Sequence, residues 1–185
     1  MQLEGLSYGC DLKDQRQRDE LLSRLRKHKP RLAIVEFPCS KWSSLSVLNA
    51  SKVNGGRQRL KKLRRLEQPL VSFSADIAWE QFNRGDDVLI ENPEASAARR
   101  LMCMQKLQKF PRMSYVIGDQ CAQGLIDPRT GLPIRKGTWW LSSSPEILDE
   151  MKRVCPCNHV HGSPLRYTGT QQYGKNLALN VIKGL

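Results

Sequence analysis

The segment Leu32–Ser40, LAIVEFPCS, is the stretch that most directly predicts the fold. Its first six residues form a short, nearly continuous apolar run with β-branched members, which is typical of strands buried on both faces of a parallel sheet. An amphipathic helix is expected before it over 15–29, and Pro30 ends that helix. We therefore expect a buried strand that leads into a loop over 38–56.

Strand and helix patterns alternate along the rest of the chain. A long helix is expected from Arg57 to about Asn83, with a kink or a break at Pro69. Further strands are expected at 88–90, 115–117 and 138–141, further helices at 96–109, 146–152 and 174–183, and a hairpin tip at 127–137. This alternation favours an α/β fold with a largely parallel sheet, in a single domain over residues 1–185 whose end, 155–185, holds a Cys/His loop and a helix.

The charge is strongly uneven. The chain has 30 Lys and Arg against 18 Asp and Glu, a net charge of +12, and residues 1–66 hold 16 of the cations but 6 of the anions. The most basic segment is the start of the long helix, with Arg57, Arg59, Lys61, Lys62, Arg64 and Arg65. Such a face attracts polyanions with an affinity that falls steeply with salt, so we expect it to hold nucleic-acid phosphates, although a solvated helix face has the same composition.

Several function classes are disfavoured. No run of about 18 apolar residues occurs, so we expect no membrane partner. The first twenty residues are polar and unlike a secretory signal, which predicts an intracellular location, the nucleus included, with the six cysteines as thiols. Neither a P-loop nor a G-x-G-x-x-G fingerprint is present.

Three expected strands are followed by tripeptides with reactive side chains, namely 38–40 (PCS), 91–93 (ENP) and 119–121 (DQC). In open α/β sheets, functional residues gather beyond the carboxyl ends of the strands. A cysteine there is often a small core residue, but Cys39 lies between a proline and a polar loop, where a nucleophilic thiolate would be presented. Glu91 is either a solvated or capping carboxylate or an acid that acts with Cys39.

Pro38–Ser40 and Glu91–Pro93 resemble, in the same order, the Pro-Cys and Glu-Asn motifs of the DNA (cytosine-5) methyltransferases. The chain as a whole resembles a methyltransferase-like module found within dinoflagellate-type retroelement polyproteins, over roughly residues 10–184. The segments that carry the resemblance are FPCSKWSSLSVLN, IENP, VIGDQCAQGL, GLPIRKGTWWLSSS and QQYGKNLALNVIKG. It implies a Rossmann-like, methyltransferase-type, mostly parallel sheet that lacks the N-terminal cofactor-loop units of that family.

The resemblance also implies a reaction. In the family, a cysteine thiolate adds to C6 of a cytosine, so that C5 takes the methyl group of S-adenosylmethionine, while a glutamate contacts N3. Carried over, Cys39 is the nucleophile and Glu91 its partner, and Asp11 contacts the adenine end of the cofactor. The substrate pocket would contain Pro38, Ser40, Trp42, Asn92, Pro93 and Lys136. A partner chain or an upstream segment would complete the cofactor site.

Two interpretations of these residues stay open. The first is an S-adenosylmethionine-dependent DNA cytosine C5 methyltransferase-like enzyme, in which Trp42 stacks on a flipped-out base or anchors the loop over the core. The second is a catalytically inactive nucleic-acid-binding module of a mobile-element polyprotein. The basic helix is expected in both.

The segment 155–161 packs four possible metal ligands into seven residues, namely Cys155, Cys157, His159 and His161. Tetrahedral zinc usually takes its ligands from two separated pairs, and Cys103 and Cys121 could supply distant partners. The usual C-x-x-C pairing is missing here, which favours a polar loop without metal.

Overall fold

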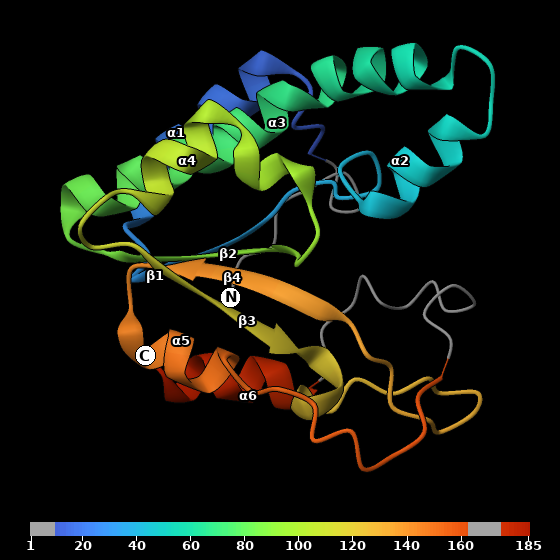
Figure 1. The fold of residues 1–185 in the computed structure, drawn as a ribbon. Helices are drawn as coiled ribbons and strands as arrows, with labels where there is room; N and C mark the ends of the chain where they lie inside the picture. The colour runs from blue at the N-terminus through green and yellow to red at the C-terminus, as the bar shows by residue number, and fades with distance from the viewer. Residues whose placement is uncertain (1–9, 163–174) are drawn as a thin grey trace. The chain divides into compact units, whose positions relative to one another are not determined.

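The computed structural model describes residues 10–162 and 175–185. The chain has an α/β fold with one four-stranded sheet, in the strand order β1-β2-β4-β3 (Figure 1). The strands are β1 (Leu32–Glu36), β2 (Asp87–Pro93), β3 (Ser114–Asp119) and β4 (Gly137–Ser142). All four lie where the sequence predicts strands, although β2, β3 and β4 extend further than expected.

The sheet is mixed, so the expectation of a mostly parallel sheet is wrong. β4 pairs antiparallel with both of its neighbours. Ser142 of β4 lies opposite Leu89 of β2 on one side and opposite Ser114 of β3 on the other. The sheet has one parallel pair. Parallel neighbours need a crossover connection, usually a helix, whereas residues 120–136 between β3 and β4 form a 3-10 turn and a loop, and β4 returns directly alongside β3.

The described residues form two compact units. The first comprises residues 10–88 and 96–107, and the second comprises 89–95, 108–162 and 175–185. Within these described ranges, no helix combines the length and the apolar character that a bilayer crossing requires.

The first unit is mainly helical. Its elements are α1 (Gln15–His28), β1, α2 (Ser44–Ser51), α3 (Gly56–Arg84), the 3-10 turn η2 (Ala97–Arg100) and most of α4 (Met102–Gln108). α1 begins where predicted, because the Asp14 carboxylate caps it by accepting a hydrogen bond from the backbone N–H of Arg16 at 2.9 Å. It ends where Lys29 adopts a left-handed backbone conformation before Pro30.

α3 is a single helix that continues through Pro69 (Figure 1). Pro69 is exposed, and the residues that follow it pack into the core, where Val71 and Phe73 are buried. Burial of this half of the helix offsets the backbone hydrogen bond that proline removes. The helix expected over 96–109 is divided into η2 and α4 instead.

α2 lies in a segment that the sequence predicts to be a loop. The Ser43 hydroxyl caps it by accepting a hydrogen bond from the backbone N–H of Ser46 at 3.1 Å. Its apolar side chains, Leu45, Val47 and Leu48, are all exposed. A search for amphipathic periodicity does not find α2, because this helix buries no continuous apolar face.

β1 is less buried than the apolar run LAIVEF predicts. Val35 and Phe37 are buried, but Ile34 is 44% exposed. β1 stands at one end of the strand order. A strand in this position alternates between buried and exposed side chains, so the expectation of burial on both faces is wrong for β1.

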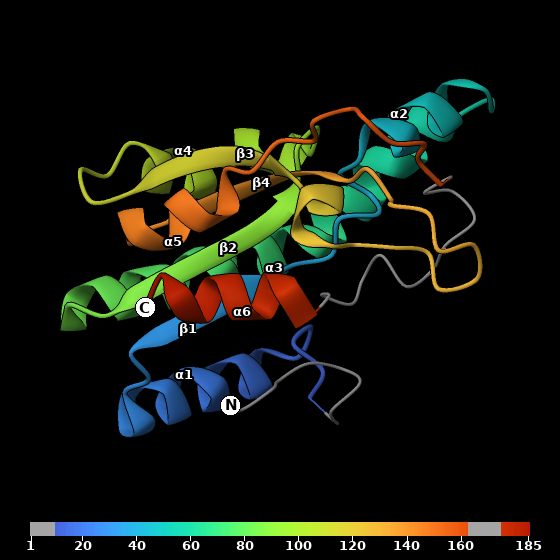
Figure 2. The ribbon, with the colours of Figure 1, turned by 90° about the horizontal axis from the view of Figure 1, so that it is seen from below.

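The second unit contains the best-buried part of the sheet. Trp139 and Trp140 are consecutive in β4 and fully buried, and consecutive strand residues point to opposite faces. Helices α5 (Pro145–Met151) and α6 (Lys175–Lys183) lie side by side, and α5 packs on β3 and β4 (Figures 1 and 2). The predicted start of the last helix, Gly174, lies outside the described residues.

Candidate functional site

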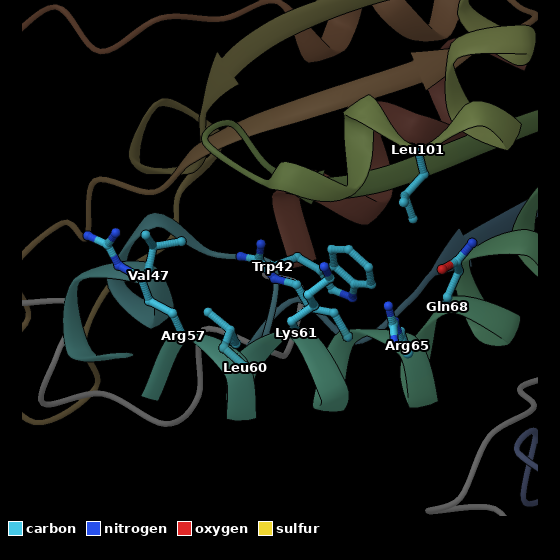
Figure 3. A pocket seen from close by; sticks show the side chains of 9 residues that line it. Trp42, Val47, Arg57, Leu60, Lys61, Arg65, Gln68 and Leu101 are labelled. Atoms are coloured by element: carbon cyan, nitrogen blue, oxygen red, sulfur yellow. The ribbon is translucent and has the colours of Figure 1, made fainter. Parts of the chain in front are cut away.

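The first unit contains an open basic pocket of about 450 Å³ (Figure 3). Its lining residues are Trp42, Val47, Arg57, Leu60, Lys61, Arg64, Arg65, Gln68 and Leu101. Four of these side chains are cationic and none is acidic. In Figure 3 the Trp42 indole lies among the side chains that α3 contributes.

Helix periodicity decides which of the predicted phosphate-binding cations face this pocket. Arg57, Lys61 and Arg65 are spaced by four residues and share one face of α3. Arg59 and Lys62 are exposed on the same helix but do not line the pocket. None of these five cations forms an ion pair with any residue in the described ranges 10–162 and 175–185.

Arg64 is anchored more firmly than its neighbours on α3. Its Nε donates a hydrogen bond to the carbonyl of Lys41 at 2.7 Å, and its guanidinium lies 5.4 Å from the centroid of the Trp42 ring. Burial lowers the pKa of Arg64, and the nearby charge of Arg100 lowers it further. Arg64 therefore contributes to the wall of the pocket as well as to its charge.

Trp42 is a buried anchor of the loop after β1, with 4% of its surface exposed. Its backbone carbonyl accepts a hydrogen bond from the N–H of Ala97 at 2.8 Å. Because it is buried, the indole offers the pocket an edge of apolar surface rather than a fully exposed stacking platform.

The Glu67 carboxyl on α3 lies near this indole. Burial raises the pKa of Glu67, and Lys41, Lys13 and Trp42 oppose this shift.

The predicted nucleophile lies at the start of the same loop. Cys39 is a half-buried thiol between the exposed residues Pro38 and Ser40. Its backbone carbonyl accepts hydrogen bonds from the N–H groups of Trp42 and Ser43, both at 3.0 Å. The tripeptide therefore forms a turn that leads directly into α2.

Glu91 lies in the second unit, inside β2 rather than beyond its end as the sequence analysis expected. Its carboxylate forms an ion pair with Lys136, with Oε1 at 3.2 Å from Nζ, and these side chains are 7% and 19% exposed. The Gln120 amide donates to the same oxygen at 3.5 Å and to the Thr138 hydroxyl at 3.0 Å. A buried carboxylate, a cation and two polar side chains thus form one network.

Burial raises the pKa of Glu91, while the charge of Lys136 and its hydrogen bond act in the opposite direction. Such an environment favours a carboxyl that can hold a proton and donate it, which is the requirement for an acid catalyst. The neighbouring Asn92 is fully buried and Pro93 is half-buried, and they lie opposite Trp139 and Thr138 of β4.

The predicted catalytic and pocket residues are divided between the two units. Cys39, Trp42 and the basic helix belong to the first, and Glu91 and Lys136 belong to the second. Within each unit the structure brings predicted residues together: Trp42 with the cations of α3, and Glu91 with Lys136.

The Cys/His segment also lies in the second unit, where it meets Cys121. The ligand atoms of Cys121, Cys155, His159 and His161 all lie within 4.8 Å of one another. Cys157 is exposed and does not belong to this group, and Cys103 lies in the first unit, where the Ser72 hydroxyl is 3.9 Å from its sulfur. Of the two distant partners named from the sequence, Cys121 therefore meets the Cys/His segment, and Cys157 lies outside the group.

Comparisons with protein-family models, curated proteins and solved structures find no match for this chain. The resemblance carried by Pro38–Ser40 and Glu91–Pro93 gains no support from them, so what it implies is a proposal.

Asp11, the residue predicted to contact S-adenosylmethionine, lies in a local turn before α1. Asp11 is exposed, and its carboxylate accepts a hydrogen bond from the backbone N–H of Lys13 at 3.0 Å in a local turn before α1. Gln17 accepts a hydrogen bond from the Asp11 backbone N–H at 2.5 Å. The Asp11 carboxylate and backbone N–H are thus both engaged in local hydrogen bonds.

Sequence reasoning missed part of both sites. The apolar pocket residues Val47, Leu60 and Leu101 carry no chemical signal, and Val47 lies in the unexpected helix α2. Gln68 does carry one, because it lies eleven residues, or about three helical turns, after Arg57 on the same face.

Proposed function

We propose that this chain binds single-stranded nucleic acid, with DNA as the first ligand to test, through the basic pocket of the first unit. The observation that carries this proposal is the chemistry of the pocket wall, which four cations and a tryptophan line and no carboxylate lines. A polyanion with apolar faces is the ligand class that such a wall suits best.

The two kinds of lining residue match the two parts of a nucleotide strand. Arg57, Lys61 and Arg65 would contact phosphates, which fixes the position of a strand without selecting its sequence. The apolar atoms of Trp42 and Leu60 would contact the face of an unpaired base. The fact that the three cations form no ion pair with any described residue supports this role.

Replacing both Lys61 and Arg65 with alanine is expected to weaken binding of a single-stranded oligonucleotide and to flatten its salt dependence. Each lost phosphate contact lowers the slope of log K against log salt by about 0.7, so the double variant should lose about 1.4. Fluorescence anisotropy over a series of salt concentrations measures both quantities.

The matched control is the double variant Arg59→Ala with Lys62→Ala. It removes the same charge from the same helix, but from side chains outside the pocket. We expect its slope to stay closer to that of the wild type. Equal slopes for the two double variants would mean that the chain attracts DNA diffusely and not through this pocket.

A second candidate function is cytosine C5 methylation, in a Rossmann-like, methyltransferase-type protein with Cys39 as nucleophile. The observation in its favour is Glu91, a buried carboxyl whose pKa is raised, next to Lys136. S-adenosylmethionine would supply the methyl group, with Asp11 of the turn before α1 as the residue proposed to contact it.

If this second candidate is correct, Cys39→Ser abolishes methyl transfer to DNA and leaves DNA affinity unchanged, because the thiolate forms the covalent bond but contributes no charge to the basic pocket. Transfer of a radiolabelled methyl group measures the activity, and anisotropy measures the affinity. Methyl transfer by Cys39→Ser at the wild-type rate would exclude Cys39 as the nucleophile. No transfer by the wild-type chain would give this second candidate no support.

A further inference from the structure

Four side chains of the second unit present ligand atoms to one point. Cys121 comes from the 3-10 turn η3 (Gln120–Gln123) that follows β3, and Cys155, His159 and His161 come from the segment after α5. Their sulfur atoms and imidazole nitrogens all lie within 4.8 Å of one another. We propose that this Cys2His2 group is a structural zinc site.

The three distances among Cys155, His159 and His161 match the edges of a tetrahedron around zinc. Bonds of about 2.3 Å to sulfur and about 2.0–2.1 Å to nitrogen place two nitrogens about 3.3 Å apart and a sulfur and a nitrogen about 3.6 Å apart. The Nε2 atoms of His159 and His161 are 3.1 Å apart. The Cys155 sulfur is 3.3 Å from Nε2 of His161 and 3.6 Å from Nε2 of His159.

The surroundings of the ligands also suit a metal site. The backbone N–H of Cys157 donates to the Cys155 sulfur at 3.3 Å, which stabilises a thiolate. The Asp119 carboxylate fixes Cys155 by accepting a hydrogen bond from its backbone N–H at 2.9 Å. The Asn158 side-chain oxygen lies 3.1 Å from Nδ1 of His159, so that Nδ1 can carry the proton and Nε2 its lone pair.

The Cys-Pro-Cys sequence supplies one ligand and one support. Cys157 has a left-handed backbone conformation, with φ of 55°, and its N–H donates a hydrogen bond to the Cys155 sulfur. Its own thiol points elsewhere and lies 3.6 Å from the carbonyl oxygen of Cys155. Cys157 is therefore a natural control for Cys121.

Four protein ligands leave no open coordination position, so the site has the form of a structural and not a catalytic centre. Zinc would fasten the turn after β3 to the segment after α5. Gln120, which contacts the Glu91 carboxylate, immediately precedes Cys121. The metal would thus also hold the turn that supports the Glu91–Lys136 pair.

The test uses the whole chain, purified under reducing conditions, with Co²⁺ as a spectroscopic probe for Zn²⁺. We expect the wild type to bind one Co²⁺ with the intense visible bands of tetrahedral coordination and a sulfur-to-cobalt charge-transfer band. Cys157→Ser should keep both. Cys121→Ser should weaken binding by more than about 100-fold, since even the loss of an outer-shell partner costs about 10- to 100-fold.

A wild-type chain that binds no Co²⁺, or binds it with only weak octahedral bands, would overturn the proposal. Equal losses in Cys157→Ser and Cys121→Ser would overturn the assignment of Cys121. If Cys121→Ser does not fold, thermal unfolding of the wild type decides. One equivalent of Zn²⁺ should raise its Tm and a chelator should lower it, and an unchanged Tm in both cases would contradict a structural site.

Discussion

Lys136→Met is expected to lower the free energy of unfolding by about 3 kcal/mol at pH 8, the cost of leaving a buried charge without its partner. The Glu91 side chain is 7% exposed and that of Lys136 is 19% exposed, so water does not replace the lost cation. Chemical denaturation followed by circular dichroism measures the change.

The loss should be smaller at pH 5 than at pH 8. The pKa of Glu91 is raised above its usual 4.5 by burial, and Lys136 opposes this shift, so removal of Lys136 raises the pKa further. A carboxyl whose pKa is raised on folding favours the folded state at low pH, and this contribution is lost as the pH rises through the folded pKa. The variant therefore protonates Glu91 more readily as the pH falls, and protonation removes the unpaired charge.

The control is the double variant Glu91→Gln with Lys136→Met, which removes both charges and keeps a polar amide beside Gln120. We expect it to be more stable than Lys136→Met alone at pH 8 and to show less dependence on pH. If Lys136→Met lowers the free energy of unfolding equally at both pH values, the ion pair is not the source of the loss. The loss then comes from the packing of the lysine stem.

Gly118→Ala is expected to lower the free energy of unfolding by about 3 kcal/mol or more, because the new methyl group has no room. A Cβ at this position would lie 2.0 Å from the carbonyl oxygen of Met151 and 3.3 Å from that of Arg153. These are backbone atoms, so β3 or the segment after α5 must move. Such a shift would strain the hydrogen bond from the Asp119 N–H to the Arg153 carbonyl, now 2.8 Å long.

Ser114→Ala provides the matched control, since Ser114 is exposed on the same strand. A surface change of this kind should alter the free energy of unfolding by less than about 0.5 kcal/mol. If Gly118→Ala costs no more than Ser114→Ala, β3 and the chain at Met151 are not as close as the structure indicates.

The elements themselves were largely predictable, because each depends on local pattern and capping. The helix that begins after Asp14 and the strands around Leu89 and Trp139 lie where the apolar periods indicate. α2 was missed because its apolar side chains are exposed, and the break at Pro69 was a prediction from proline chemistry that burial of the following residues outweighs.

The sites were predictable in their residue types but not in their membership. The basic start of α3 was evident from composition, yet which cations share a pocket depends on the helix phase and on Trp42 from a different segment. The sequence likewise showed Cys155 and Cys157 side by side and offered both Cys103 and Cys121 as distant partners, whereas only the structure shows that Cys121, more than thirty residues away, meets Cys155.

The sequence by itself determined the local properties of this protein: the α/β composition, the concentration of positive charge before residue 66 and the presence of Cys39, Glu91 and a Cys/His segment. The tertiary structure alone decided the mixed sheet, the pairing of Glu91 with Lys136 and the convergence of Cys121 on the Cys/His segment. The physical reason is that periodicity and capping act over a few residues. The direction of a strand and the convergence of distant ligands instead depend on the path of the segments that connect the strands and helices. That path is set by the packing of the whole unit.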